Sequence, residues 1–246
     1  MQNFRADLHI HTVLSPCADL EMTPRKIVGR AVEAGLHIIG ITDHNSTLNA
    51  EVVRKLGEEK GILVLMGAEV TTREEVHCLA FFEDSEKREI FQKFLDENKN
   101  RIPNPDGHFG YQPMVDADEN IMEMIPYYLT AAIKRSIDEV SNKVQELEGI
   151  FIPAHVNRPM NGLFAQLGIL PSDLVFDALE ITGKTRSDDV RKQFQLDESI
   201  TLIRSSDAHF PQQIGTSYSV FEMEEATFSE IKKTLNQLNN RKVRIE

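Results

Sequence analysis

HIIGITDH at residues 37–44 and ILVLMGAE at residues 62–69 decide the fold, because each is a short apolar run that ends in a side chain able to bind a metal ion. These side chains are His44 and Glu69, and IFIPAH repeats the pattern with His155 at its end. In β/α barrels and open parallel sheets, the carboxyl ends of the strands open onto one shared face. We therefore expect these three side chains to lie near one another.

Short apolar runs alternate with helical patterns along the chain, which is typical of a β/α protein with a largely parallel sheet. The predicted strands are residues 4–10, 38–42, 63–68, 78–82, 150–154, 178–181 and 202–205. The predicted helices are residues 23–35 (apolar stripe Ile27, Val28, Ala31 and Val32), residues 47–60, and two that begin at the capping boxes Ser136/Glu139 and Thr227/Glu230.

Residues 102–120 break this rhythm, because they are rich in Pro, Asn, Asp and Gly. A helical segment follows to about residue 148. We expect one domain over residues 1–246, with residues 102–148 inserted as a helical and loop cap beside the site.

Two pairs of polar residues with a spacing of two follow strands. His9 and His11 lie in DLHIHT, and Asp207 and His209 lie in SSDAH. Alternate residues of a strand point to one face, so each pair can hold one metal ion. Histidine and carboxylate ligands together suit Zn, Mn or Fe.

His77 opens its strand instead of closing it. The connection 70–76 is too short for a crossover helix, so the strands that carry Glu69 and His77 are expected to pair antiparallel. His77 then lies at the same edge as Glu69. Taken alone, His77 is equally consistent with a half-buried histidine of the core, and His155 with a histidine that hydrogen-bonds a neighbouring loop. Taken together, however, six of the chain's eight histidines lie at predicted strand ends, and this recurrence favours a common site.

Composition narrows the class of protein. The formal net charge is −12, which disfavours attraction to a nucleic-acid backbone and predicts no long nucleic acid among the partners. No apolar run approaches the ~20 residues of a membrane span. Without a secretory signal pattern we expect a cytoplasmic protein, and we expect Cys17 and Cys78 to be reduced thiols.

Taken in order, DLHIHT, ITDHN, GAEVT, EVHCLAFF, PAHVNRP and SSDAHF resemble the motifs of the PHP (polymerase and histidinol phosphatase) family. The resemblance runs from residue 7 to about residue 210. It implies an α/β fold, a distorted (β/α)7 TIM-like barrel of the PHP type, with two or three divalent metal ions and phosphoesterase activity.

The resemblance also implies a ligand set. His9, His11, Glu69 and Asp207 would hold one ion, Glu69 would bridge to a second ion held by His77 and His155, and His44 and His209 would hold a third. Relatives supply one more ligand from the segment after the first histidine pair, and here that segment departs from the family pattern. Asp19 is the first choice, because a carboxylate suits Mn or Fe, and Cys17 is the second, because a thiolate suits Zn.

The expected reaction is hydrolysis of a small phosphomonoester by a hydroxide that bridges two metal ions. Arg158 would bind phosphate oxygens, with Lys184 and Arg186 as weaker candidates. His209, or His44 where its metal ion is absent, would protonate the leaving oxygen. We accordingly predict His209, Arg158 and Asp207 as catalytic residues.

Two alternatives stay open. One is a phosphodiesterase or exonuclease that acts on nucleotides or short oligonucleotides, and the other is a metal-binding regulatory module without turnover. The remaining histidines are assigned other roles: His37, which precedes a strand, is interpreted as structural, and His108 as a solvated loop residue.

Overall fold

The computed structural model describes residues 1–183 and 185–245. A sheet of seven strands in the order β11-β10-β1-β2-β3-β4-β7 forms the centre of the molecule. Its strands are β1 (Gln2–Ile10), β2 (Ile38–Ile41), β3 (Leu63–Thr71), β4 (His77–Phe82), β7 (Ile150–Pro153), β10 (Ser219–Met223) and β11 (Lys242–Ile245). The pair β8 (Leu179–Glu180) and β9 (Leu202–Ile203) is parallel and contacts β7 and β11, so the curled sheet forms a half-barrel with this pair at its open side.

The sheet is mixed. Strands β1, β2 and β3 are parallel, whereas β4 runs antiparallel to both β3 and β7, and β10 runs antiparallel to β1 and β11. The predicted antiparallel pairing of the strands that carry Glu69 and His77 is therefore confirmed. The α/β class is confirmed as well, but the predicted count of seven β/α units is not.

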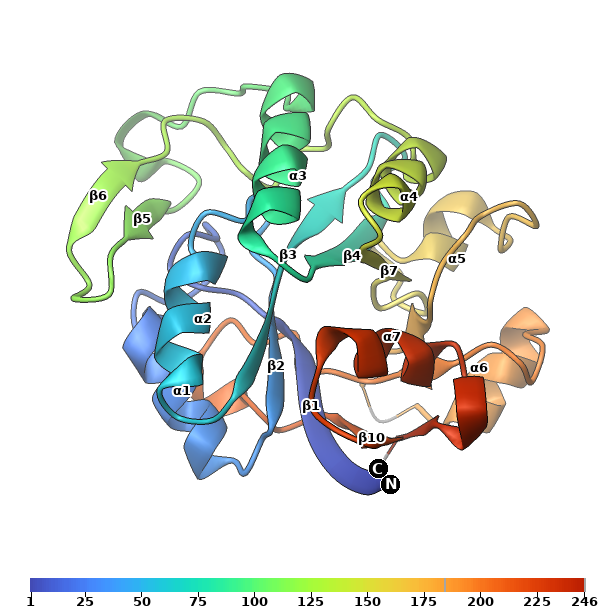
Figure 1. Ribbon diagram of the computed structural model, residues 1–246. Helices are drawn as coiled ribbons and strands as arrows, with labels where there is room; N and C mark the ends of the chain where they lie inside the picture. The colour runs from blue at the N-terminus through green and yellow to red at the C-terminus, as the bar shows by residue number, and fades with distance from the viewer. Residues whose placement is uncertain (184, 246) are drawn as a thin grey trace.

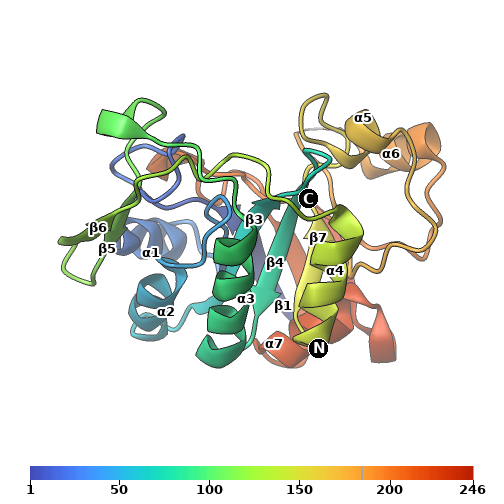
Figure 2. The same cartoon turned by 90° about the horizontal axis from the view of Figure 1, so that it is seen from above.

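Helices cover both faces of the sheet (Figures 1 and 2). They are α1 (Pro24–Glu33), α2 (Ala50–Glu58), α3 (Ser85–Asn98), α4 (Ile137–Glu146), α5 (Leu163–Leu167), α6 (Ser187–Phe194) and α7 (Phe228–Leu235), with short 3-10 turns at Pro105–Gly107, Pro211–Gln213 and Leu238–Asn240. Two apolar clusters pack α1 to α4 against one face, and a third packs α7 against the other through Phe228, Ile231 and Leu235.

Local sequence signals explain several helix ends. Ser136 and Glu139 form the predicted capping box of α4. Thr227 caps α7 through the backbone N–H of Glu230, but the Glu230 carboxylate contacts Arg241 instead of closing a box. Val32 was predicted to face the core with the α1 stripe, yet its side chain is 49% exposed.

The segment predicted as a helical and loop insertion contains a hairpin. Strands β5 (Pro113–Val115) and β6 (Ile121–Met124) pair antiparallel and project from the body of the molecule (Figure 1). Helical structure resumes only at α4, because residues 125–136 lack a continuous apolar period. The prediction of a purely helical and loop insertion is therefore wrong, whereas its role as a cap and the division into domains stay predictions.

Among the described helices, none is both long enough and apolar enough to cross a membrane. The cytoplasmic location stays a prediction.

Candidate metal centre

Histidine and carboxylate side chains converge at one end of the curled sheet. We call this set the histidine cluster: His9, His11, His44, Glu69, His77, His155, Asp207 and His209. The strands bring them together as the topology requires, because β1, β2, β3, β7 and β9 end here and the antiparallel β4 begins here.

Glu69 lies at the centre of the cluster and is 1% exposed. Its Oε1 lies 2.8 Å from Nδ1 of His77 and 3.0 Å from Nε2 of His155. Its Oε2 lies 3.1 Å from Nδ1 of His44, although the geometry of that contact is not that of a hydrogen bond. One carboxylate thus faces imidazole nitrogens from three other strand ends.

On the other side of Glu69, the Nε2 atoms of His9 and His11 lie 3.2 Å apart. Each also approaches two carboxylates: Oδ1 of Asp207 lies 3.3 Å from His9 and 3.4 Å from His11, and Glu69 lies at the same two distances. His9 lies where the register of β1 against β2 shifts, between Asp7 and Ile10.

Buried acceptors fix how these two imidazoles face the cluster. Nδ1 of His9 donates to the carboxylate of Glu180 at 3.0 Å. Nδ1 of His11 donates to Oγ of Ser15 at 2.9 Å, and that hydroxyl donates to Asp43 at 2.7 Å. With Nδ1 committed as a donor, Nε2 of each ring points at the cluster, where it is an acceptor whenever the ring is neutral.

The third group of possible ligands contains His11, His44 and His209, whose ring nitrogens lie within 4.8 Å of one another. Neither Asp19 nor Cys17 joins a group of this kind in the part of the chain that the structure describes. The backbone N–H of Asp19 donates to the carbonyl of His209 at 2.8 Å, but its carboxylate accepts from the backbone two residues ahead. Cys17 is exposed as a whole residue, but its sulfur is largely surrounded by protein atoms. This burial of the sulfur and the negative charge of Glu69 raise the pKa of the thiol to about 12.

The electrostatics of the cluster keep its carboxylates ionised. Burial alone would raise the pKa of Glu69, but His77, His9 and His44 together hold it well below its usual value. Burial lowers the pKa of His11 to about 4, with His209 adding to the shift, and burial lowers that of His44 well below its usual range. Burial also disfavours the charged form of His9, but the carboxylates of Glu180, Asp207 and Glu69 outweigh it and raise the pKa of His9 well above its usual value. His11 and His44 are thus already in the neutral state that metal binding requires, whereas a cation beside His9 would displace a proton.

Backbone strain is concentrated at the same place. His155 and Asp207 have φ values of 30° and 52°, in the left-handed region that non-glycine residues rarely adopt, and Asn45, next to His44, has a φ of 46°. Such residues cost about 1–3 kcal/mol each and persist where function or packing over-determines them. Strained residues next to or within the cluster therefore support a functional role for it.

Arg158 and Arg186, two of the cations predicted to bind phosphate oxygens, have different surroundings. Arg158 is 45% exposed and donates through Nη1 to Oδ2 of Asp207 at 2.8 Å, so it stands at the edge of the cluster. Arg186 is 77% exposed and lies 3.6 Å from Asp188. Lys184 lies outside the described residues.

The two histidines predicted to lie apart from the site do so. His37 is exposed at the amino end of β2, where its Nδ1 accepts from the backbone of Arg5. His108 is exposed in the insertion, with its ring 4.9 Å from that of Phe109.

Two buried amides tie the insertion to the strand ends beside the cluster. Asn45 donates to the carbonyls of Leu129 and Ala131, at 2.6 and 3.0 Å. Asn49 accepts from the backbone of Val115 and donates to Oγ1 of Thr12, which follows the His9–His11 pair. The insertion is thereby held as a wall next to the site.

Sequence reasoning missed Glu180 and Asp43. Glu180 is the last residue of β8, but the predicted strand ran on to residue 181, so Glu180 did not stand at a predicted strand end as Glu69 did. Asp43 directly precedes His44 and accepts hydrogen bonds from Thr12 and Ser15. Burial raises its pKa to about 6.

Comparisons with known proteins bear on this geometry. A family model described as "PHP domain" matches residues 7–154, and one described as "PHP-associated" matches residues 199–239. These spans contain the motifs on which the resemblance to the PHP family rested except PAHVNRP, which begins at residue 153 and carries His155, and that resemblance is confirmed.

Solved structures share the fold. The lesion-specific endonuclease PfuEndoQ from Pyrococcus furiosus is 22% identical with a TM-score of 0.71, over 98% of this chain and 58% of that chain. A putative metal-dependent phosphoesterase from Bifidobacterium adolescentis is 22% identical with a TM-score of 0.55, over 83% of this chain and 87% of that chain. The uncharacterized protein YqxK of Bacillus subtilis is 23% identical over 99% of this chain and 64% of YqxK. The chain thus spans less than two thirds of the endonuclease and of YqxK.

The prediction of no long nucleic acid among the partners is wrong. Endonuclease Q, with a TM-score of 0.70 to this chain and 21% identity over 98% of this chain and 58% of its own, has been solved in complex with a 27-mer duplex substrate that carries an abasic lesion at the active site. The net charge of −12 therefore does not exclude a long nucleic acid for this fold. Net charge is an average over the whole surface, whereas binding depends on the field at one face, which bound cations can reverse.

Proposed function

Because this chain belongs to the PHP domain family of metal-dependent hydrolases, we propose that it hydrolyses phosphate esters at the histidine cluster. The observation that carries the proposal is the convergence on Glu69 of imidazole nitrogens from separate strand ends, at distances of 2.8 to 3.4 Å. The activity, the substrate and the partners of the whole protein are part of the same proposal.

The donor set fits divalent cations. Nε2 atoms of His9 and His11 that both lack a proton would repel each other at 3.2 Å, and a cation between them and the carboxylates removes that repulsion. Nδ1 of His155 and Nδ1 of His44 are buried without a hydrogen-bond partner among the described residues. A buried polar atom of this kind is expected to bind a metal ion or an ordered water.

The ligand sets follow from the contacts. His9, His11, Glu69 and Asp207 would hold one ion, and Glu69, His77 and His155 a second. His44 and His209 would hold a third, with Asp19 as the first candidate to complete it and Cys17 as the second. The mixture of nitrogen and oxygen donors suits Zn, Mn and Fe alike.

Divalent cations at these positions supply Lewis-acid activation of water and neutralise the charge of the phosphate. Arg158 stays hydrogen-bonded to Oδ2 of Asp207, which leaves Oδ1 for the centre and the rest of the guanidinium at the rim for phosphate oxygens. His209 donates through Nδ1 to the carbonyl of Asp207, so its Nε2 is the atom that would bind the third ion or, where that ion is absent, carry the proton that the leaving oxygen takes.

Water is the nucleophile in this proposal. Ser15 is close to the cluster, but its hydroxyl donates to Asp43 and accepts from His11, so it is not available for attack. Cys17 has a thiol with a pKa of about 12, which leaves almost no thiolate at neutral pH.

Two substrate classes compete. A small phosphomonoester is the first, because Asn45 and Asn49 tie the insertion to strand ends beside the cluster, where it would limit the size of the substrate. A phosphodiester in a nucleic acid is the second, and the likeness of the fold to endonuclease Q, over 98% of this chain, favours it.

The test loads the protein with Mn²⁺, Zn²⁺ or Fe²⁺ and measures turnover of p-nitrophenyl phosphate, nucleoside 5′-monophosphates, bis(p-nitrophenyl) phosphate and an abasic oligonucleotide. His9→Ala and Asp207→Asn should abolish turnover of whichever substrate is cleaved, whereas the matched control His37→Ala should retain it. A protein that binds metal ions but shows turnover of none of these substrates would be a regulatory module, and the proposal would fail.

A further inference from the structure

We propose that a pocket beside the histidine cluster binds a phosphate group of the substrate other than the one that is cleaved, and this inference rests on the proposed function. The pocket has a volume of about 540 Å³. We call it the rim pocket: Thr182, Gly183, Arg204, Ser205, Ser206, Thr216, Ser217 and Tyr218.

The topology places the rim pocket on the same face as the cluster. Thr182 follows β8 and Ser205 follows β9, whose parallel strands both end at that face. Thr216 to Tyr218 precede β10, and β10 runs antiparallel to β1, so its start lies there too. Three loops of the same rim therefore form the pocket.

Hydrogen bonds join the pocket to the cluster. Ser206 directly precedes Asp207, and its Oγ lies 3.5 Å from the carbonyl oxygen of His9. The backbone N–H of Thr182 donates at 2.9 Å to Asn157, the residue before Arg158. A substrate held at Arg158 and Asp207 thus has the rim pocket as its neighbour.

The lining carries hydroxyl groups that lack partners. Ser205 is 8% exposed, and its Oγ makes no hydrogen bond with any described residue. The same holds for Oγ of Ser217, among the residues that the structure places. A buried hydroxyl without a partner is rare and is expected where a ligand or ordered water completes it.

The charge of the lining favours an anion. None of the eight described lining residues is Asp or Glu, in a chain that contains 39 of them, and Arg204, whose Nη2 donates to the carbonyl of Thr185 at 2.6 Å, contributes positive charge. Arginine with serine, threonine and tyrosine hydroxyls is the donor set that contacts phosphate without reading sequence. The ligand is therefore a second phosphate, from either a neighbouring nucleotide of a strand or the far end of a small bisphosphate.

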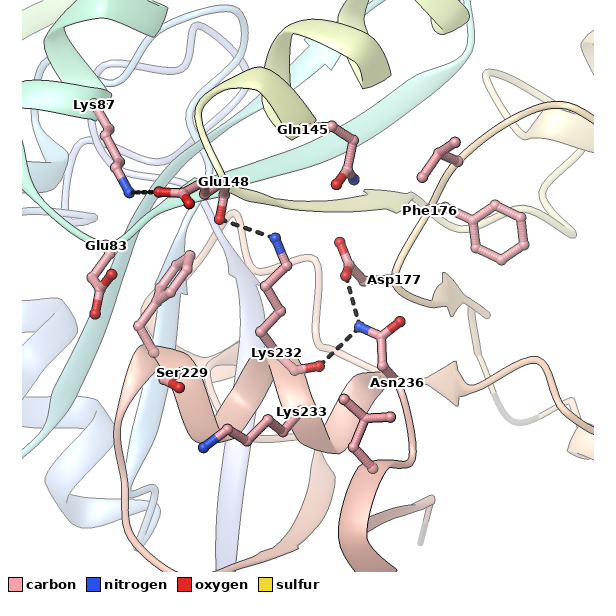
Figure 3. A pocket seen from close by; sticks show the side chains of 13 residues that line it. Glu83, Lys87, Gln145, Glu148, Phe176, Asp177, Ser229, Lys232, Lys233 and Asn236 are labelled. Carbon is pink, nitrogen blue, oxygen red and sulfur yellow. Dashed lines mark hydrogen bonds and ion pairs between the residues drawn. The ribbon is translucent and has the colours of Figure 1, made fainter.

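A second pocket shows why cations alone do not make a phosphate site. This distal pocket, of about 630 Å³, contains Lys87, Lys232 and Lys233 (Figure 3). Lys87 contacts Glu148, Lys232 donates to the carbonyls of Glu148 and Gly149, and Lys233 contacts Glu230. Each ammonium group there has an acceptor, and three carboxylates, those of Glu83, Glu148 and Asp177, also line the pocket, so no phosphate site is assigned to it.

The test compares the double variant Ser205→Ala/Ser217→Ala with the matched control Ser229→Ala, whose serine lines the distal pocket. Loss of unpartnered hydroxyls leaves the fold intact. The probes are p-nitrophenyl phosphate, thymidine 3′,5′-bisphosphate and a 5′-phosphorylated oligothymidylate. We expect KM for at least one of the two probes with several phosphates to rise about tenfold or more, with kcat and turnover of p-nitrophenyl phosphate unchanged.

A rise with the oligothymidylate alone identifies a strand, and a rise with the bisphosphate identifies a small substrate. Unchanged KM for both, or an equal loss with all three probes, overturns the proposal. If the wild-type protein cleaves none of them, the proposed function fails but the subsite is still tested by calorimetric titration of the same two probes into the protein. The double variant should then bind about tenfold more weakly than Ser229→Ala, and equal affinity overturns the subsite.

Discussion

The histidine cluster and the distal pocket are both polar and lie at opposite ends of the same strands. Glu83 follows β4, Glu148 precedes β7 and Asp177 precedes β8, which places the distal pocket at the far end of the sheet. There the charged groups have partners. Lys87 lies 2.7 Å from Glu148, and Asp177 accepts from the side chain of Asn236 (Figure 3). Asp177 also accepts from the backbone N–H of Phe151.

In the cluster, by contrast, the pairing of polar groups is incomplete. The Nε2 atoms of His9 and His11 lie 3.2 Å apart beside the carboxylates of Glu69 and Asp207, and two other ring nitrogens have no hydrogen-bond partner among the described residues. The difference teaches that incomplete pairing, and not size or polarity, marks the end of the sheet where chemistry is expected. The far end is a set of satisfied contacts that holds helices in place.

The largest expected effect comes from Glu69→Gln. Removal of the charge shared by both proposed ions should lower bound metal per chain and reduce turnover by more than the roughly 10- to 100-fold that loss of an outer contact costs. Elemental analysis and phosphate release measure both. The matched control is Glu148→Gln at the far end, which should leave metal content and turnover unchanged; equal losses in the two variants would remove the contrast.

Glu180→Gln should have the next largest effect. Oε2 of Glu180 accepts from Nδ1 of His9 and from the backbone N–H of His155, both at 3.0 Å, and a glutamine replaces this charged acceptor with a neutral one and brings an NH2 group beside the Nδ1–H of His9. We expect metal affinity to fall about 10- to 100-fold with the fold retained. Competition with a chelating dye gives the affinity and circular dichroism checks the fold; wild-type affinity would show that Glu180 does not orient His9.

Gly162→Ala tests the backbone behind the rim. A Cβ there would lie 2.3 Å from the carbonyl oxygen of Arg158 and 3.0 Å from that of His155. The loop must shift, so we expect a loss of about 1–3 kcal/mol in the free energy of unfolding together with reduced turnover. Gly29→Ala, which meets no atom within 4 Å in helix α1, should be neutral or stabilising. Urea unfolding compares the two.

The smallest effect concerns the pH dependence of a charge pair at the far end. Arg241 holds the pKa of Glu230 at about 2, below its ordinary value of 4.5, so the stabilisation is present above pH 4.5 and is lost as pH falls toward 2. The difference in stability between wild type and Glu230→Gln should therefore be constant above pH 5 and shrink below it. Unfolding curves at several pH values measure it, and a difference that grows on acidification contradicts the pairing.

The sequence predicted the strands that carry the cluster because each ends a short apolar run in a polar residue. His77 followed from the length of one connection. Strands β10 and β11 were not predicted, because SVFEM and KVRI are short segments without a clear apolar pattern; β11 is a partly exposed edge strand, whereas β10 is mostly buried between β11 and β1. Glu180 was missed because its role depends on the approach of β8 to His9, a contact between residues far apart in the chain.

The insertion shows the same limit. Its Pro, Asn and Asp content correctly predicted departure from the β/α rhythm, but the β5–β6 hairpin forms from short segments that no periodicity marks. Helix α3 was also not predicted, although Asp84 caps it by accepting from the backbone N–H of Lys87. The cap was visible in the sequence, whereas the strained conformations of His155 and Asp207 were not.

The most direct measurement of the central claim is an anomalous difference map from crystals of the protein grown with Mn²⁺. We predict peaks on the two sides of the Glu69 carboxylate, one in contact with His9, His11 and Asp207 and the other with His77 and His155. A map without a peak beside Glu69, from crystals that contain Mn²⁺ elsewhere, would contradict the account.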